Sequence, residues 1–305
     1  MKFFLNLKGK SKDGYKMSFI KTLKEISKGD VNIAGGKGAH LGELIKINIP
    51  VPPGFVILSS AFETFLEKDT IVEIEEKMKK ADINDIKSLD SDSENIRNLI
   101  LKNKVSEELE KEILDAFGKL NVKYVAVRSS ATAEDSRIAS WAGELETYLN
   151  TNKETLIENV KKCWASLFTT RALIYRIKKG LLDKKISVAV VIQKMVNSEI
   201  AGVCFTSHPV TKKDQIIIEA CSGLGDALVS GRVTPDSYVV EKYSLKILDI
   251  KVNPPNEKQK LSERQIREIA NLCINIEDHY KEPQDIEWAF EKDKFYIVQT
   301  RPITV

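Results

Sequence analysis

Apolar and polar positions follow two different periodicities along the chain, and the change falls near residue 187. Before that point, apolar residues recur mostly at helical spacing, as Leu41, Leu44 and Ile45 do after Lys37. In this part the pattern predicts short strands at 55–58 and 124–128, charged helical segments within 70–120, and a long helix over about 154–179. The first part is therefore predicted to mix helices with a few strands.

The second part consists of short β-rich runs separated by turn residues, such as "ISVAVVIQKMV", "DQIIIEACSG" and "DSYVVEKY". One amphipathic helix is predicted over about 263–280, and two more strands close the chain. The predicted fold class is α+β with two lobes: a mixed α/β lobe at 17–186 and a mainly antiparallel β lobe with helices at 187–305. Residues 1–16 are interpreted as an N-terminal extension, because Met17 is a candidate start. A cleft between two lobes is a usual place for a ligand.

Composition narrows the class of protein. The chain has 305 residues, 42% hydrophobic and 30% charged, which is typical of a globular protein. A net charge of +3 is too small to indicate nucleic acid binding and suits small anionic ligands better. The four cysteines form no CxxC pair, which favours reduced thiols in a cytoplasmic protein. No signal peptide or membrane-spanning run is visible, so no membrane partner is expected.

The stretch "IAGGKGAHLGEL" at 33–44 places two adjacent glycines and a lysine at the start of the first predicted helix. It is not a P-loop, because Val31 stands where that motif has its first glycine, and Gly38 follows Lys37 where the motif has Ser or Thr. Two interpretations stay open from these residues alone. One is a phosphate-binding loop at a helix N-terminus, and the other is a turn that contains a lysine.

The C-terminal hairpin "DIEWAFEKDKFYIVQTR" places polar residues two apart on each strand, so that each pair shares a face. A three-residue loop at 292–294 would set Glu287 opposite Gln299 and Asp285 opposite Arg301, all on one side. Carboxylate and amide oxygens suit Mg²⁺, and an arginine fork suits phosphate, so this face is a candidate Mg²⁺–triphosphate site. The alternative is a solvated hairpin face with cross-strand ion pairs.

On the same register, the apolar residues Trp288, Phe290, Tyr296 and Val298 fall on the opposite side of the hairpin. That distribution predicts that this second side is buried in a core.

Three further glycine- or charge-bearing stretches are candidates. In "VRSSATAEDS", Arg128 at a strand end can reach a γ-phosphate, or it can form an ion pair with Glu134 or Asp135. Gly143 in "WAGELETYLN" would let backbone approach a ligand closely. Asp226 in "CSGLGDALVSG" is a candidate ribose or metal contact, and the alternative there is a strand-to-helix turn.

Taken together, these stretches resemble the N-terminal, ATP-grasp-like nucleotide-binding domain of the phosphoenolpyruvate synthase, pyruvate phosphate dikinase and rifampicin phosphotransferase family. The resemblance runs from about Asp30 to Pro302. It is carried, in order, by "GGKGAHLGEL", "VPPGF", "AVRSSATAED", "SWAGELETYLN", "SLFTTRALIYR", "IQKMV", "GLGDALVSGRVTPDSY" and "DIEW" with "QTRP". The family adds an ATP-grasp-like character to the two lobes.

The resemblance implies roles for particular residues. Lys37 would contact the ATP phosphates, with Gly35, Gly36 and Gly38 keeping the loop open, and Arg128 would hold the γ-phosphate. The same resemblance implies nucleotide contacts, including a main-chain adenine hinge, at Gly143, Thr147, Gln193, Lys194, Met195 and Val196, with Asp226 at the ribose. Asp226 stands where the family more often has Glu.

The resemblance also implies that Glu287 and Gln299 ligate Mg²⁺ with Asp285 supporting, and that Arg301 clamps phosphate. ATP and Mg²⁺ are thus the implied cofactors. Sites of this kind act mainly through positioning and charge neutralisation.

One departure from the family concerns the phosphate acceptor. In the family a histidine on a separate swivelling domain, in a motif like G-G-x-x-S-H-A-A, takes the phosphate. None of His40, His208 and His279 stands in such a motif. The implied partners are therefore a phosphohistidine-bearing domain or subunit and a small-molecule final acceptor, such as pyruvate, a rifamycin or a phenol.

The resulting hypothesis is an ATP-dependent dikinase-type phosphotransferase domain that binds Mg·ATP between two lobes and phosphorylates a histidine in trans. Two alternatives stay open: an ATP-grasp carboxylate ligase, and a nucleotide-sensing subunit without turnover.

Overall fold

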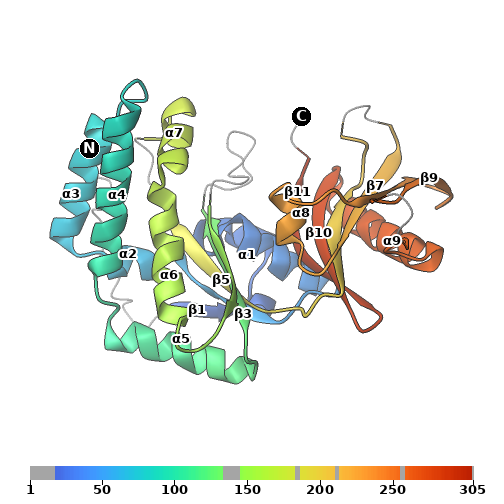
Figure 1. Cartoon of the computed structure of the whole chain (residues 1–305). Coiled ribbons are helices and arrows are strands. Elements are labelled where there is room, and N and C mark those ends of the chain that lie inside the picture. Colours follow the sequence, from blue (N-terminus) through green and yellow to red (C-terminus); the bar gives the residue numbers. More distant parts are fainter. Residues whose placement is uncertain (1–17, 133–144, 183–185, 210–212, 255–257, 304–305) are drawn as a thin grey trace. The chain divides into compact units, whose positions relative to one another are not determined.

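The computed structural model describes residues 18–132, 145–182, 186–209, 213–254 and 258–303 (Figure 1). The chain divides into two compact units: Met1–Gly42 with Pro53–Met195, and Glu43–Pro52 with Val196–Val305. Both combine helices with an antiparallel sheet, so the predicted α+β class is confirmed. Among the described residues, no helix has the length and apolar character needed to cross a membrane.

The structure places the boundary between the units elsewhere than at residue 187. Strand β5 (Val188–Lys194) is a central strand of the first sheet, where it pairs with β2 (Gly54–Ile57) and β3 (Val125–Ala131). All but the last residue of β5 are buried, as its unbroken apolar run suggests. Because β5 has the same β-branched, apolar composition as the strands after it, the sequence pattern does not reveal which sheet it joins.

The first unit is built on a sheet with strand order β1-β2-β5-β3-β4 over the described residues, and every neighbouring pair is antiparallel. Its edge strands are β1 (Ile20–Thr22) and β4 (Thr147–Thr151). Side chains alternate between the two faces. On β3, Val125 and Val127 join the apolar core, whereas Arg128 lies on the other face.

Helices cover the apolar face of this sheet. Helices α2 and α6 contact β5, α6 also contacts β3, and α4 lies against α6 and α7 (Figure 1). The helices are α1 (Val31–Lys46, whose residues from Glu43 belong to the second unit), α2 (Ser59–Phe65), α3 (Lys68–Lys80), α4 (Ile86–Lys102), α5 (Glu107–Leu120), α6 (Leu156–Ala165) and α7 (Thr170–Lys178). Short 3-10 turns lie at η1 (Leu23–Glu25), η2 (Lys28–Asp30) and η3 (Ser166–Phe168).

The long helix expected over about 154–179 is instead two helices, α6 and α7, joined by η3. The break is explained by Thr169, whose backbone is extended and whose hydroxyl accepts a hydrogen bond from the N–H of Ala172 at 3.2 Å. A threonine at this position is a favourable N-cap and starts a new helix. The apolar spacing continues across the break, which is why periodicity alone did not show it.

The second unit has a sheet of order β11-β10-β6-β7-β8-β9 over the described residues, again antiparallel throughout (Figure 1). Helix α9 packs on one face through Ile266, Ile269, Cys273 and Ile276, all fully buried. The elements are β6 (Ile200–Phe205), β7 (Gln215–Ser222), α8 (Asp226–Val229), β8 (Asp236–Glu241), β9 (Ile247–Lys251), α9 (Glu263–Tyr280), β10 (Gln284–Glu291) and β11 (Lys294–Pro302).

The hairpin β10–β11 contains the predicted polar pairs, but the turn that connects its strands differs from the predicted one. Asp285 lies opposite Arg301 and Glu287 opposite Gln299, as predicted. The connection, however, has two residues, since Glu291 pairs with Lys294. A β-bulge between Glu287 and Trp288 adds the residue that the shorter loop lacks.

Because of this bulge, the prediction for the apolar side of the hairpin is wrong on strand β11. Trp288 pairs with Ile297 and Phe290 pairs with Phe295, and these four side chains are buried. The two residues expected there on β11, Tyr296 and Val298, are only partly buried. The two turn residues, Lys292 and Asp293, have φ of 50° and 57°, as a tight type I′ hairpin turn requires. Because neither is glycine, the sequence carries no strong signal for that turn.

Candidate active site

The glycine-rich stretch forms a kink inside helix α1. Gly35 has φ 69° and ψ 172°, a region open essentially only to glycine, and helical backbone resumes after it. A Cβ at Gly35 would lie 2.3 Å from the carbonyl oxygen of Ser130. The kink therefore rests directly on the backbone of β3, with no room for a side chain. Lys37 lies in the first turn after the kink and is partly buried.

Ser130 holds this kink through its hydroxyl. Its Oγ donates to the carbonyl of Ala34 at 2.9 Å and accepts from the N–H of Gly38 at 3.2 Å. These two groups lie on opposite sides of Gly35, where the helix ladder is interrupted. Ser130 is fully buried. Sequence reasoning did not single out this residue, although it stands two positions after Arg128 in the quoted motif and so shares its face of the strand.

Arg128 is held on the same sheet face as the kink. Only 6% of it is exposed, and its NH1 donates to the Oε1 of Gln193 at 3.3 Å. Arg128 pairs in register with Val191, and a Cβ on Gly38 would lie 3.6 Å from the Cγ2 of Val191. The phosphate-loop candidate and Arg128 thus gather over one patch of the first sheet. The alternative partners of Arg128, Glu134 and Asp135, lie outside the described residues.

The other nucleotide-binding candidates of the first unit lie close by in the sheet. Thr147 pairs with Arg128 across β3 and β4 and is exposed. Gly143 lies outside the described residues. At the end of β5, the N–H of Lys194 donates to Pro53 at 2.9 Å and that of Met195 donates to Tyr124 at 3.2 Å.

The segment 193–196 was predicted to contact adenine through its main chain. Its first side chain, that of Gln193, accepts a hydrogen bond from Arg128, which the sequence analysis did not predict. The first unit ends at Met195, and the chain enters the second unit at Val196. This segment therefore joins two strands that belong to different sheets, β5 and β6.

The second unit carries the candidate metal residues on one face of the hairpin. Asp285 and Arg301 form an ion pair, in which Nε and NH2 of Arg301 donate to Oδ2 of Asp285 at 2.9 and 2.6 Å. Glu287 and Gln299 lie side by side in register and are partly buried. The cross-strand ion pair considered as the alternative is thus present between Asp285 and Arg301. The candidate oxygen ligands, Glu287 and Gln299, form the other pair.

A third carboxylate belongs to this face and was missed in the sequence analysis. Glu287 pairs with Val203, and Val203 pairs with Glu219 on β7, so Glu219 lies on the same face two strands away. Partial burial and the charge of Asp285 raise the pKa of Glu219. The available signal was its position in "IIIEAC", a lone acid flanked on both sides by apolar residues of strand β7.

These residues do not form a metal cage of their own. Among the described residues, no group of three or more His, Cys, Asp or Glu side chains is close enough to hold a metal ion. One carboxylate and one amide oxygen, as at Glu287 and Gln299, fit Mg²⁺ that keeps substrate phosphates and waters as its other ligands. The donor set therefore suits Mg²⁺ brought with a nucleotide.

Asp226 stands at the first position of the short helix α8 and is paired with Arg232. The two side chains are 47% and 63% exposed, and Arg232 also donates its Nε to the hydroxyl of Ser230 at 2.7 Å. The strand-to-helix turn considered as the alternative for this stretch is what the structure shows locally. The ribose role of Asp226 stays a prediction.

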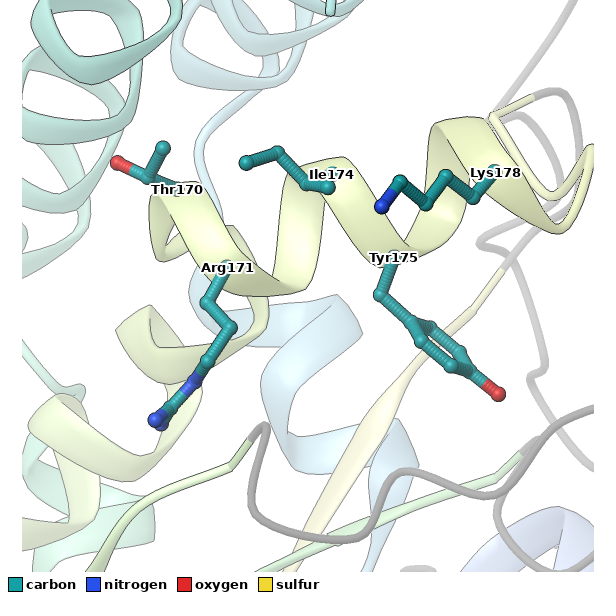
Figure 2. Close-up of a pocket in the computed structure, with 5 residues that line it drawn as sticks. All are labelled: Thr170, Arg171, Ile174, Tyr175 and Lys178. Atoms are coloured by element: carbon teal, nitrogen blue, oxygen red, sulfur yellow. The ribbon is translucent and has the colours of Figure 1, made fainter. Parts of the chain in front are cut away.

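A hollow on helix α7 is separate from these residues. It has a volume of about 430 Å³ and is lined by Thr170, Arg171, Ile174, Tyr175 and Lys178 (Figure 2). Four of the five lining residues come from the "SLFTTRALIYR" stretch, Lys178 follows it by two positions, and none of the predicted site residues takes part. The hollow is wide open to solvent, so it is not an enclosed ligand cavity.

Comparison with known proteins settles the family. The model of the pyruvate phosphate dikinase AMP/ATP-binding domain matches residues 31–258 and 250–305. The chain belongs to this family. The resemblance derived from the ordered motifs is confirmed.

Curated relatives agree with this assignment. The chain is 47% identical to a probable phosphoenolpyruvate synthase of Archaeoglobus fulgidus, over 92% of this chain and 41% of that protein. It is 43% identical to the phosphoenolpyruvate synthase of Pyrococcus furiosus, over 94% of this chain and 44% of that protein. The chain therefore spans less than half the length of these relatives.

Among solved structures, D-alanine–D-alanine ligase of Helicobacter pylori is similar with a TM-score of 0.30 and 12% identity, over 65% of this chain and 47% of the ligase. At that score the likeness carries no argument about the site.

Proposed function

We propose that this chain is the ATP-binding part of a phosphoenolpyruvate synthase-type dikinase, which binds Mg·ATP and phosphorylates a histidine on a separate domain or subunit. The observation that carries the proposal is the gathering of Arg128, Gln193 and the Lys37 loop on one face of the first sheet. Family membership and the relatives named phosphoenolpyruvate synthase support the reaction class.

In this proposal the first unit binds the phosphates. The glycine kink offers backbone at a helix N-terminus, where N–H groups and the helix dipole favour an anion. Lys37 adds a positive charge in the same turn. Arg128 is presented by a buried strand and oriented by Gln193, so little rearrangement is needed for its guanidinium to meet phosphate oxygens.

The second unit is proposed to serve the same Mg·ATP through its hairpin face. Glu287 and Gln299 would hold Mg²⁺, with Asp285 supporting. Bound there, the ion would neutralise phosphate charge as the phosphoryl group moves. Arg301, which donates Nε and NH2 to Asp285, is proposed to bind a phosphate of the nucleotide as well.

The reaction that follows is phosphoryl transfer by positioning. In the proposed overall step, ATP and water give AMP and orthophosphate, while a histidine of the partner carries what was the β-phosphoryl group. No residue of this chain forms a covalent bond in the scheme. Lys37, Arg128 and Arg301 hold the phosphate oxygens and their developing charge.

The test is transfer of label from β-³²P-ATP. The chain would be incubated with Mg²⁺ and with the part of the Archaeoglobus fulgidus relative that it does not cover, as the source of the histidine. We expect acid-labile, base-stable label on that part and release of AMP. Lys37→Ala, run in parallel, is expected to lose the label.

Three results would contradict the proposal. Formation of ADP that retains the β-label, with none on the acceptor, would indicate an ordinary kinase reaction instead of the dikinase reaction. Trapping of a hydroxamate with hydroxylamine and a carboxylic acid would indicate a carboxylate ligase, and tight ATP binding without any transfer would indicate a nucleotide sensor.

A further inference from the structure

The buried hydroxyl of Ser130 is placed where helix α1 lacks a capping group of its own. Gly35 interrupts the helix, so the residues after it form the first turn of a new helical stretch, and the N–H groups of a first turn have no intrahelical acceptor. The residue at the start of such a turn normally supplies a side-chain oxygen to the N–H two or three positions on. Gly35 holds that place and has no side chain.

Ser130 supplies that oxygen from another element. Counting Gly35 as the N-cap, Gly38 is the third residue of the turn, and its N–H donates to the Oγ of Ser130 at 3.2 Å. The same Oγ donates to the carbonyl of Ala34 at 2.9 Å, on the other side of the kink. One hydroxyl therefore joins both sides of the interruption, with Lys37 between the residues that it ties.

The position of this hydroxyl is rigid. Ser130 is fully buried in β3 and pairs with Ala189 on β5, the central strand of the sheet. A Cβ on Gly35 would approach the Oγ and the carbonyl of Ser130 to less than 2.5 Å, so the two backbones are already in direct contact. The strand that fixes Ser130 is also the strand that presents Arg128, two residues earlier and on the same face.

We propose that Ser130 is a positioning residue for nucleotide binding: its hydroxyl caps the helical turn after Gly35 and holds Lys37 in fixed register with Arg128. The inference rests on the proposed function, because it takes the Lys37 loop as the phosphate-binding element. Ser130 itself need not contact the nucleotide.

The neighbouring serine is a matched control. Ser129 is buried to the same degree, stands on the same strand and has a hydroxyl that donates to the carbonyl of Glu146 and accepts from Ser166. Those contacts lie on the opposite face of the sheet, away from α1. Ser129→Ala and Ser130→Ala therefore remove equivalent groups from the two sides of one strand.

The experiment measures Mg·ATP affinity by calorimetry and amide hydrogen exchange of α1 in the whole chain, for the wild type, S130A, S129A and Lys37→Ala. We expect S130A to weaken Mg·ATP binding about tenfold, the effect of roughly one to two lost hydrogen bonds, and to speed exchange of the Gly38 amide at least about tenfold. S129A should keep the Mg·ATP affinity and the exchange rate of the Gly38 amide within about twofold of the wild type, even if it lowers the unfolding temperature as much as S130A does.

The outcomes separate the two proposals. If the wild type binds Mg·ATP and Lys37→Ala does not, but S130A binds as the wild type does, the positioning role is overturned and the proposed function stands. Faster Gly38 exchange in S130A without loss of affinity also overturns it, since the hydroxyl would then be structural alone. A wild type that does not bind Mg·ATP overturns the proposed function, and this inference with it.

Discussion

Gly35 combines a positive φ with a close approach to another backbone, whereas the described glycines Gly180, Gly223 and Gly231 have a positive φ in open space. Replacing it by alanine forces a Cβ into a region with φ 69° and ψ 172°, which costs roughly 1–3 kcal/mol for a residue other than glycine. The added Cβ would also lie 2.3 Å from the carbonyl oxygen and 2.5 Å from the carbonyl carbon of Ser130. Because these are backbone atoms of β3, a buried strand with a neighbour on each side, they cannot rotate away, and overpacking of this kind costs roughly 1–3 kcal/mol more.

Gly35→Ala is therefore expected to destabilise the first unit by about 2–6 kcal/mol. Gly180→Ala is the matched control. Gly180 also has a positive φ, 63°, but a Cβ there would meet nothing within 4 Å, so only the backbone cost of about 1–2 kcal/mol applies. The difference between the two variants measures the contact between the glycine kink and β3.

The assay is urea unfolding followed by tryptophan fluorescence in a Trp288→Phe background. Of the three tryptophans, Trp288 is the one in the second unit, so the remaining signal reports the first unit. Buried Trp164, packed against Phe65 with ring centroids 4.7 Å apart, should give most of the change. If Gly35→Ala shifts the midpoint no further than Gly180→Ala, the kink is not held against Ser130 as described, and the argument from close approach is wrong.

Three further changes test the charges. Arg128→Ala should keep Mg·ATP binding within about tenfold but lower phosphoryl transfer at least about a hundredfold, measured as labelled phosphohistidine per minute; equal loss of both would show a binding role only. Glu287→Gln, or removal of Mg²⁺ with EDTA, should abolish transfer, and transfer by the variant at the wild-type rate would exclude Glu287 as a ligand. Asp236 is fully buried; burial alone would raise its pKa, but hydrogen bonds from the N–H groups of Asn253 and Lys260 outweigh it and lower the pKa. Its stabilisation is therefore present above its unfolded pKa of about 3.9 and lost as pH falls through the lower folded value, so the free energy of unfolding should drop in acid for the wild type and much less for Asp236→Asn.

The sequence predicted the class of each element better than its boundaries. Periodicity identified the apolar face over 154–179, because α6 and α7 both pack apolar residues into the same hydrophobic core. It did not reveal the break, because the break depends on one capping hydroxyl at Thr169 rather than on a change of pattern. In the same way β5 was recognised as a strand, but its partners in the first sheet depend on contacts far apart in the chain.

Among the candidate site residues, those in charged or glycine-rich motifs could be named from the sequence, and those that orient them could not. Arg128 and the glycines stand out by chemistry. Ser130 and the side chain of Gln193 are ordinary strand residues, and only the fold shows that they hold the kink and the guanidinium. Glu219 likewise joins the hairpin face only through the register of two neighbouring strands.

The hairpin β10–β11 shows why a correct pairing is not yet a correct structure. A two-residue loop alone would have moved Gln299 and Arg301 to the apolar face, since a slip of one residue exchanges the faces of a strand. The bulge at Glu287–Trp288 restores them, and it falls between the polar and the apolar halves of the hairpin. Each half thus keeps its own register: Trp288 and Phe290 face the core opposite Ile297 and Phe295, while Glu287 and Gln299 share the other face. Bulges are frequent beside active sites because they re-aim side chains without ending the pairing. The one-residue adjustment therefore lets a single hairpin contribute Trp288 and Phe290 to a core near its turn and keep the candidate metal ligands Glu287 and Gln299 on the other face.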